Sequence, residues 1–159
     1  MKYSSRLGFS FLEMLVVLLL IALLASWALP QWHEVYSYEQ QKQAIRNVCS
    51  ALQLSRLLAV QHQDTTYFCL LGPKQQCVRN RATGYKLFYY TQDGQKVVIE
   101  QHLFKHHIRL YWQGLASDNR IAFNPWGGSS ANGHIKIKGG SNHVPKVLVS
   151  HTGRVRLSH

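Results

Sequence analysis

The chain has 159 residues, enough for one long helix and one small domain, and carries 18 lysines and arginines against seven acids, a formal net charge of +11. Such an excess of positive charge indicates an acidic partner, such as nucleic acid or anionic lipid. The acids are scattered, and no nucleophile elbow, phosphate-binding loop or carboxylate pair occurs, so the sequence predicts neither an enzyme nor a bound cofactor.

The first 30 residues are a short basic leader followed by an apolar run. The run from Phe9 to Leu29 holds 21 residues, and as an α-helix it would cover about 31 Å, close to the hydrocarbon thickness of a bilayer. Lys2 and Arg6 precede it. The positive-inside rule therefore predicts a single membrane pass with the leader in the cytoplasm.

Two simpler interpretations fit this segment less well. A cleaved signal peptide has an apolar core of about 7–15 residues and a small-residue cleavage site. Here the run is longer, and the small pair Ala25-Ser26 is followed by bulky Trp27. A plain membrane anchor leaves Glu13 unexplained, because a carboxylate in an apolar helix costs a few kcal/mol and needs a partner.

The stretch from Arg6 to Leu15, RLGFSFLEML, resembles the class III leader of type IV pilins and type II secretion pseudopilins. The resemblance implies that a prepilin peptidase cuts between Gly8 and Phe9 and methylates the new N-terminus. Glu13 would then pair with the N-terminal amine of a neighbouring pilin. The implied organisation is a leader (1–8), a transmembrane and assembly helix (9–29), the second half of that helix (30–63) and a globular β domain (64–159).

Beyond Pro30 the sequence resumes a helical pattern. Apolar residues recur at three- and four-residue spacing at Tyr38, Ile45, Val48, Cys49 and Leu52. We expect one long helix from Phe9 to about Gln61, kinked or loosened near Pro30.

From Asp64 onward the pattern is that of β-strands. We expect strands at 65–71, 85–91, 96–101, 108–113, 119–124, 134–138, 146–150 and 154–158, with tight turns at Asp93-Gly94 and Thr152-Gly153. A helix followed by antiparallel strands predicts an α+β fold.

Three cysteines are present. Cys69 and Cys77 flank Gly72-Pro73, a turn signal, and a disulfide between them is permitted in an exported domain. Closing so short a loop would stabilise the fold by about 2.5 kcal/mol in the chain-entropy model. Cys49 lies in the helix and is interpreted as a buried apolar residue, with a bridge to one of the other two as the alternative.

The C-terminal half carries a second resemblance. The segments IAFNP (121–125), NGHI (132–135), VLVS (147–150) and GRVR (153–156) are similar to the GspH/FimT branch of minor pseudopilins and minor pilins. The branch implies a type IV pilin fold, a long N-terminal helix packed on a C-terminal domain of two small antiparallel sheets. The helix segment 54–59 keeps the Arg56 and Ala59 of the branch but lacks its acid.

The C-terminal tail is basic throughout, and no acid follows Asp118. Strand alternation places Arg154 and Arg156 on one outer face, roughly 6.6 Å apart, close to the spacing of successive phosphates. Lys136 and Lys138 share an outer face in the same way, and Lys146 adds to this charge. A solvated strand face is the alternative, but such a face ordinarily mixes charges of both signs.

The FimT resemblance also implies DNA binding, because some FimT-like pilins bind DNA in natural transformation through a Gly-Arg-x-Arg tail, matched here by Gly153, Arg154 and Arg156. We predict a minor type IV pilin of the inner membrane with a periplasmic C-terminal domain, which enters a pilus at the cell surface and binds DNA without sequence specificity for uptake. The alternative is a type II secretion minor pseudopilin or a structural pilus-assembly subunit without DNA binding. Secretion pseudopilins tend to be acidic, which favours the first interpretation.

Two further patterns have residue types that can form binding sites. Trp126 lies in a glycine-rich loop, and we interpret it as an anchor packed on the domain, with stacking on a base of single-stranded DNA as the alternative. His102, His106 and His107 offer imidazoles at metal-ligand spacing, but no carboxylate or cysteine motif accompanies them. No metal site is predicted.

Overall fold

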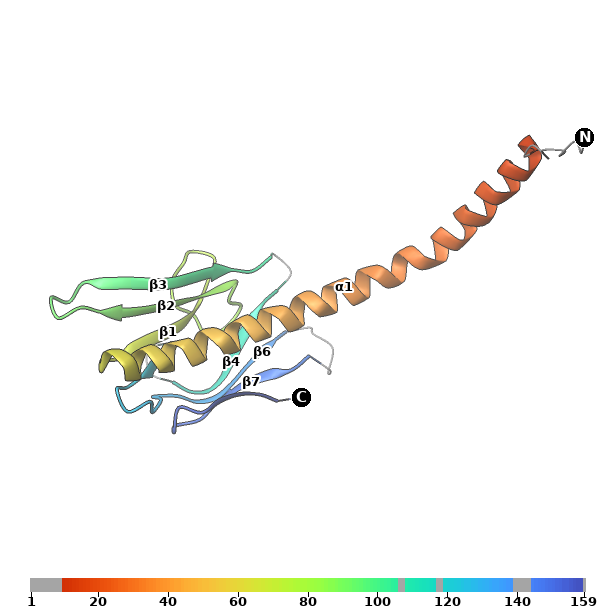
Figure 1. The fold of residues 1–159 in the computed structure, drawn as a ribbon. Coiled ribbons are helices and arrows are strands. Elements are labelled where there is room, and N and C mark those ends of the chain that lie inside the picture. Colours follow the sequence, from red (N-terminus) through yellow and green to blue (C-terminus); the bar gives the residue numbers. More distant parts are fainter. Residues whose placement is uncertain (1–9, 106–107, 117–118, 139–143, 159) are drawn as a thin grey trace, which may run out of the picture. The chain divides into compact units, whose positions relative to one another are not determined.

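The computed structural model describes residues 10–105, 108–116, 119–138 and 144–158, apart from the side chains of 27–34. The predicted order of a long helix followed by strands is confirmed (Figure 1). The elements are α1 (Phe11–His62), β1 (Thr66–Leu71), β2 (Gly84–Tyr90), β3 (Lys96–Leu103), β4 (Leu110–Leu115), β5 (Arg120–Phe123), β6 (Asn132–Ile137), β7 (Lys146–Val149) and β8 (Val155–Ser158).

The chain forms two compact units, Met1–Ser37 and Tyr38–His159. In the first unit, large apolar side chains of α1 from Phe11 to Leu24 are exposed. The backbone stays helical through Pro30. Of the helical residues described, no stretch reaches the length and hydropathy of a membrane span. Gly8 and Phe9, the predicted cleavage site, lie outside the described residues.

The second unit holds two four-stranded antiparallel sheets, which confirms the predicted pair of sheets. Sheet A has the order β3-β2-β1-β5, and sheet B has the order β4-β6-β7-β8. In Figure 1 the second half of α1 runs along both sheets, with β1 to β3 on one side and β4, β6 and β7 on the other. The chain moves from sheet B back to sheet A at β5 and returns to sheet B at β6.

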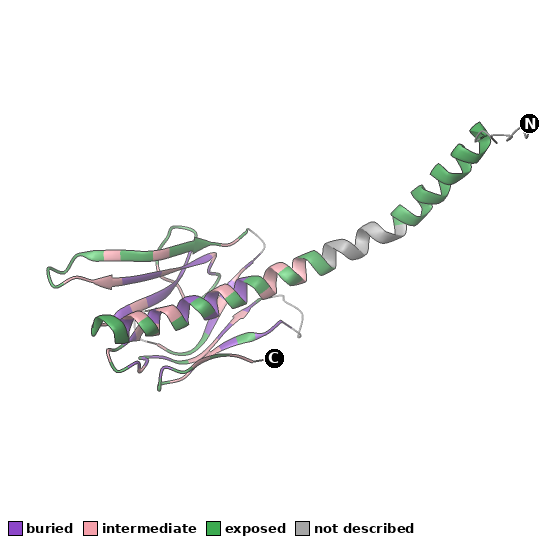
Figure 2. Cartoon of the chain, viewed as in Figure 1, coloured by how far each residue is buried: buried purple, intermediate pink, exposed green. Residues whose placement is uncertain are grey.

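One apolar core lies between α1 and the two sheets. Of the helix residues predicted from periodicity, Ile45, Val48, Cys49 and Leu52 are buried in this core and Tyr38 packs against it half-buried. Each sheet supplies its inward-facing residues, visible as the buried positions in Figure 2. The largest side chains that are fully buried there include Ile45, Leu52, Phe68, Phe123, Leu110, Ile135 and Val147. Burial of this apolar surface holds the helix on both sheets.

The predicted disulfide between Cys69 and Cys77 is present, with the two Cα atoms 5.5 Å apart. It belongs to a second, smaller apolar cluster with Leu71 and Phe88, on the face of sheet A that points away from α1. Cys49 is a free, buried cysteine in the main core, and burial raises the pKa of its thiol. The interpretation of Cys49 as a packing residue is confirmed.

Strand boundaries differ from expectation mainly in sheet B. The strand expected at 108–113 begins at Leu110, and the strand expected at 134–138 begins at Asn132. A glycine pair lies where β4 extends to Leu115 and β6 begins at Asn132: Gly114 and Gly133 face each other across the two strands, and a Cβ on either would collide with the backbone of the other strand. The pairing thus continues through two glycines, where propensity alone would end it.

Two loops of the second unit are fastened to α1 by a contact that we call the glycine junction, made of Arg56, Gly127 and Gly153. Arg56 Nε donates a hydrogen bond to the Gly127 carbonyl at 3.0 Å. Gly153 is buried with φ of +72°, and a Cβ there would overlap that same carbonyl. The junction thus joins the helix, the loop after β5 and the β7–β8 turn.

We predict that Gly153→Ala destabilises the domain by about 2–4 kcal/mol, because the new Cβ combines a left-handed backbone with overpacking against a fixed carbonyl. Gly94→Ala is the matched control, since Gly94 has φ of +75° but open space around it, and should cost only about 1 kcal/mol. Urea unfolding measures both. Equal costs for the two variants would contradict the role given to the junction.

Candidate nucleic-acid interface

The outer face of sheet B gathers the cations that the sequence singled out. Strand alternation turns Ile135, Val147 and Val149 into the core. The residues between them point the other way. We call this set the basic face, and it comprises His134, Lys136, Lys138, Lys146, Arg154 and Arg156.

Strand register shows how the members of the basic face lie. His134 on β6 is opposite Leu148 on β7, which is opposite Arg156 on β8. Lys138 Nζ lies 5.8 Å from the ring centroid of Tyr111, which pairs with Lys136 across β4 and β6. The structure therefore brings all five predicted cations onto one face. Arg154, Arg156, Lys138 and Lys146 are exposed, and Lys136 is half-buried.

The basic face has charge of one sign only. Lys42 and Glu39 form an ion pair on α1, whereas no member of the basic face forms an ion pair with a described acid. Other described acids of the second unit belong to sheet A or its connections: Asp64, Asp93 and Glu100, the last bonded to the Tyr85 hydroxyl at 2.6 Å. The strands of sheet B contain no acid.

The DNA-binding residues predicted from the sequence do not include His134, although it alternates with Lys136 on β6 and with Lys138 just after it. Partial burial, followed by the charges of Lys146 and Lys136, lowers the pKa of its imidazole. His134 is therefore neutral at neutral pH and is surrounded by cations. An anion bound here would favour its protonation.

A shallow hollow of about 270 Å³ lies at the end of this surface that holds Arg154 and Arg156. Its lining includes Asn132, His134, Ser150, Arg154 and Arg156, from β6, the end of β7 and β8. The turn beneath it is held by hydrogen bonds from Gly153 N to the Ser150 carbonyl (2.8 Å) and from Ser150 N to the Arg154 carbonyl (3.1 Å). Both arginines thus project from a well-ordered turn and strand.

Gly153 and Trp126 do not have the surroundings that the sequence predicts for them. Gly153 is buried, so its part is to shape the turn that carries Arg154. Trp126 was expected to pack on the domain, and this is wrong, because its side chain is 86% exposed. The loop closes instead through backbone hydrogen bonds and the Asn124 side chain, which accepts from Gly128 N at 2.7 Å.

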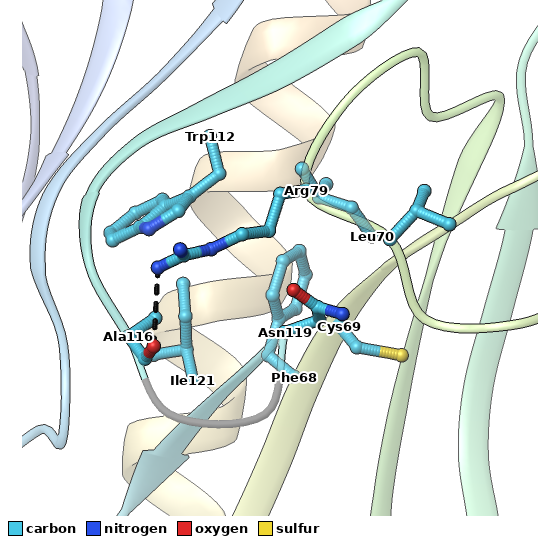
Figure 3. A pocket seen from close by; sticks show the side chains of 9 residues that line it. Phe68, Cys69, Leu70, Arg79, Trp112, Ala116, Asn119 and Ile121 are labelled. Atoms are coloured by element: carbon cyan, nitrogen blue, oxygen red, sulfur yellow. Dashed lines mark hydrogen bonds between the residues drawn. The ribbon is translucent and has the colours of Figure 1, made fainter.

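The second unit also has a small pocket between β1 and β4, lined by residues that include Arg79, Trp112 and Ile121 (Figure 3). Arg79 Nη2 donates to the Ala116 carbonyl at 3.1 Å within it. Its volume of about 10 Å³ admits no more than one water molecule. This pocket is too small for a substrate.

Metal binding has no support in the described part of the chain, where no three histidine, cysteine or acidic side chains come together. The His102 ring stacks on Tyr85 and contacts the edge of Phe104. His106 and His107 lie outside the described residues.

Comparison with known proteins agrees with this architecture. A family model described as type II transport protein GspH matches residues 44–153, and the prokaryotic N-terminal methylation motif matches residues 3–29. No curated protein sequence matches the chain.

Two solved structures share the fold. The type IV minor pilin FimU of Pseudomonas aeruginosa aligns with a TM-score of 0.58 at 14% identity, over 76% of this chain and 90% of that one. The minor pseudopilin EpsH of the Vibrio cholerae type II secretion system aligns with a TM-score of 0.57 at 12% identity, over 76% and 94%. The family match covers more than half of the sequence. The chain therefore belongs to the GspH family and is a minor pilin or pseudopilin of a type IV pilus or a type II secretion system.

Proposed function

We propose that this protein is a FimT-like minor pilin that binds extracellular DNA through the basic face, without sequence specificity, for uptake in natural transformation. The observation that carries the proposal is the gathering of five lysines and arginines on a sheet whose strands hold no acid. A polyanion is the partner that such a surface attracts, because each phosphate neutralised releases a condensed counterion.

The spacing of the cations suits a chain of regularly spaced phosphates. Arg154 and Arg156 alternate along one strand edge, about 6.6 Å apart, and a guanidinium binds phosphate through two parallel hydrogen bonds. Lys146 and Lys136 continue the charge across β7 and β6. A backbone lying across β8, β7 and β6 would meet a cation at each strand.

The same geometry accounts for the absence of sequence preference. The cations stand on a sheet face, and contacts to phosphates fix position but carry no sequence information. Four to six neutralised phosphates would give a slope of log affinity against log salt of roughly −3 to −5.

The N-terminal unit supplies assembly in this proposal. A prepilin peptidase cuts between Gly8 and Phe9 and methylates Phe9, and the segment 9–29 anchors the subunit in the inner membrane until it enters the pilus. The exposed apolar side chains of α1 between Phe11 and Leu24 are the contacts available to lipid and to other pilins. Glu13, exposed on the first turns of α1, pairs with the N-terminal amine of its neighbour.

A second function has its own support: the matching family model describes a type II transport protein, and EpsH shares the fold. In that case the chain is a secretion pseudopilin or a purely structural subunit, and the basic face touches another pilin. The neighbouring genes distinguish the two possibilities: pilus genes would support a pilus subunit, and secretion genes would support a secretion pseudopilin.

We predict that Arg154→Gln with Arg156→Gln weakens DNA binding by the full-length chain in a neutral detergent about tenfold and lowers the salt slope by about 2, because two phosphate contacts are lost. Fluorescence anisotropy with a labelled duplex at several salt concentrations measures both quantities.

The matched control is Lys74→Gln with Arg81→Gln, which removes the same charge from exposed positions on the β1–β2 connection. It should change affinity less than threefold. Equal weakening by the two double variants would show that net charge, and not this face, binds DNA. If the wild-type chain shows no salt-dependent DNA binding, the proposed DNA binding is wrong and the structural function is favoured.

We also predict that DNA binding tightens by about three- to tenfold between pH 7.5 and pH 5.5, and that His134→Gln removes part of this gain. The lowered pKa of His134 means that the free protein resists protonation. Bound phosphate raises that pKa, so affinity increases as pH falls.

His102→Gln on sheet A is the control and should keep the full gain. Because the lowered pKa also makes the free fold less stable in acid, circular dichroism checks folding at each pH. Identical pH profiles for wild type and His134→Gln would contradict the placement of phosphate beside this ring.

A further inference from the structure

The loop after β5 presents an aromatic ring to solvent on a rigid base. Trp126 is 86% exposed. Its loop is closed by hydrogen bonds from Gly127 N to the Asn124 carbonyl (2.8 Å) and from Asn124 N to the Gly128 carbonyl (3.0 Å). The next residue, Gly127, is fixed by Arg56 in the glycine junction. An exposed indole on an ordered loop loses little conformational freedom when it stacks on a planar ligand.

A groove of about 380 Å³ lies at this junction. One wall is the end of α1, with Arg56, Leu57 and Val60, and the other is the start of β8, with Arg154 and Val155. Leu57 and Val60 are 60% and 42% exposed, an apolar surface on an otherwise polar helix end. Apolar walls flanked by guanidinium groups suit a flat, weakly polar ring attached to an anionic chain.

Arg154 connects this groove to the basic face. It lines both the 380 Å³ groove and the 270 Å³ hollow that contains His134 and Arg156. A nucleic acid strand whose phosphate lies on Arg154 would have its other phosphates over the basic face and its bases beside the groove. Among the described acids, Asp64 is the nearest along the chain to Val60 of this groove. Its carboxylate accepts a hydrogen bond from Thr65 N.

We propose that Trp126 and the adjoining groove bind unpaired bases, so that this protein prefers single-stranded over double-stranded DNA. The proposal rests on the proposed function and names its substrate class. In a duplex the bases are stacked on each other and inaccessible to the indole, so a duplex gains only the phosphate contacts. An unpaired base can stack on an aromatic ring whatever its identity.

The test uses the full-length chain in a neutral detergent with a labelled oligodeoxythymidine of about 20 nucleotides and a duplex of equal length. Wild type should bind the single strand at least fivefold more tightly than the duplex at equal salt. Trp126→Ala should weaken single-strand binding at least fivefold and change duplex binding less than twofold. The salt slope should stay unchanged, because stacking releases no counterions.

Two controls make the result specific. Trp126→Phe should retain part of the preference, since a smaller ring still stacks. Leu103→Ala removes another exposed apolar side chain, on sheet A, and should leave both affinities unchanged. Trp126 is exposed, so its variants should unfold at the same urea concentration as wild type.

The outcomes separate this inference from the function beneath it. If Arg154→Gln with Arg156→Gln weakens both DNA forms but Trp126→Ala weakens neither, or weakens both equally, the base-stacking site is overturned and DNA binding stands. If wild type binds neither form at low salt, both proposals fail.

Discussion

The hydrogen bond from Arg56 Nε to the Gly127 carbonyl is the contact on which the arrangement of the functional surface depends. That carbonyl is also the atom against which Gly153 packs without a side chain. One backbone oxygen thereby holds together the end of α1, the loop that carries Trp126 and the turn that carries Arg154. The Ser129–His151 backbone hydrogen bond (2.9 Å) adds a second fastening between the two loops.

This constraint gives a cationic surface its shape. Fixing a long arginine side chain at the surface costs conformational entropy, and isolated surface ion pairs contribute little to stability. Here Arg154 follows a tight turn whose Gly153 packs against the Gly127 carbonyl that Arg56 binds, and Arg156 lies within a paired strand. The core beneath, with Ile135, Val147 and Val149, fixes sheet B by burial, so the charged residues on its other side keep their spacing. Rigid packing on one face of the sheet therefore organises charge on the other.

Much of this architecture could be predicted from alternation alone. Period-two patterning placed Arg154 and Arg156 outward, and the predicted turns at Gly94 and Gly153 adopt the left-handed conformation. Other features depend on contacts distant in the sequence. The Gly114–Gly133 pairing that extends β6 needs two strands to meet, and the exposure of Trp126 follows from a loop that satisfies its own hydrogen bonds. Arg56 carried no signal of its partner, because Gly127 lies 71 residues away.

The central claim is that DNA lies on sheet B and on the loops of the glycine junction. Hydrogen–deuterium exchange of the full-length chain, with and without DNA, tests it most directly. The account predicts slower exchange on DNA binding at β8, at residues 150–154 and at residues 124–128, with β2 and β3 unchanged. Protection confined to sheet A or to the first half of α1, with none at β8, would contradict it.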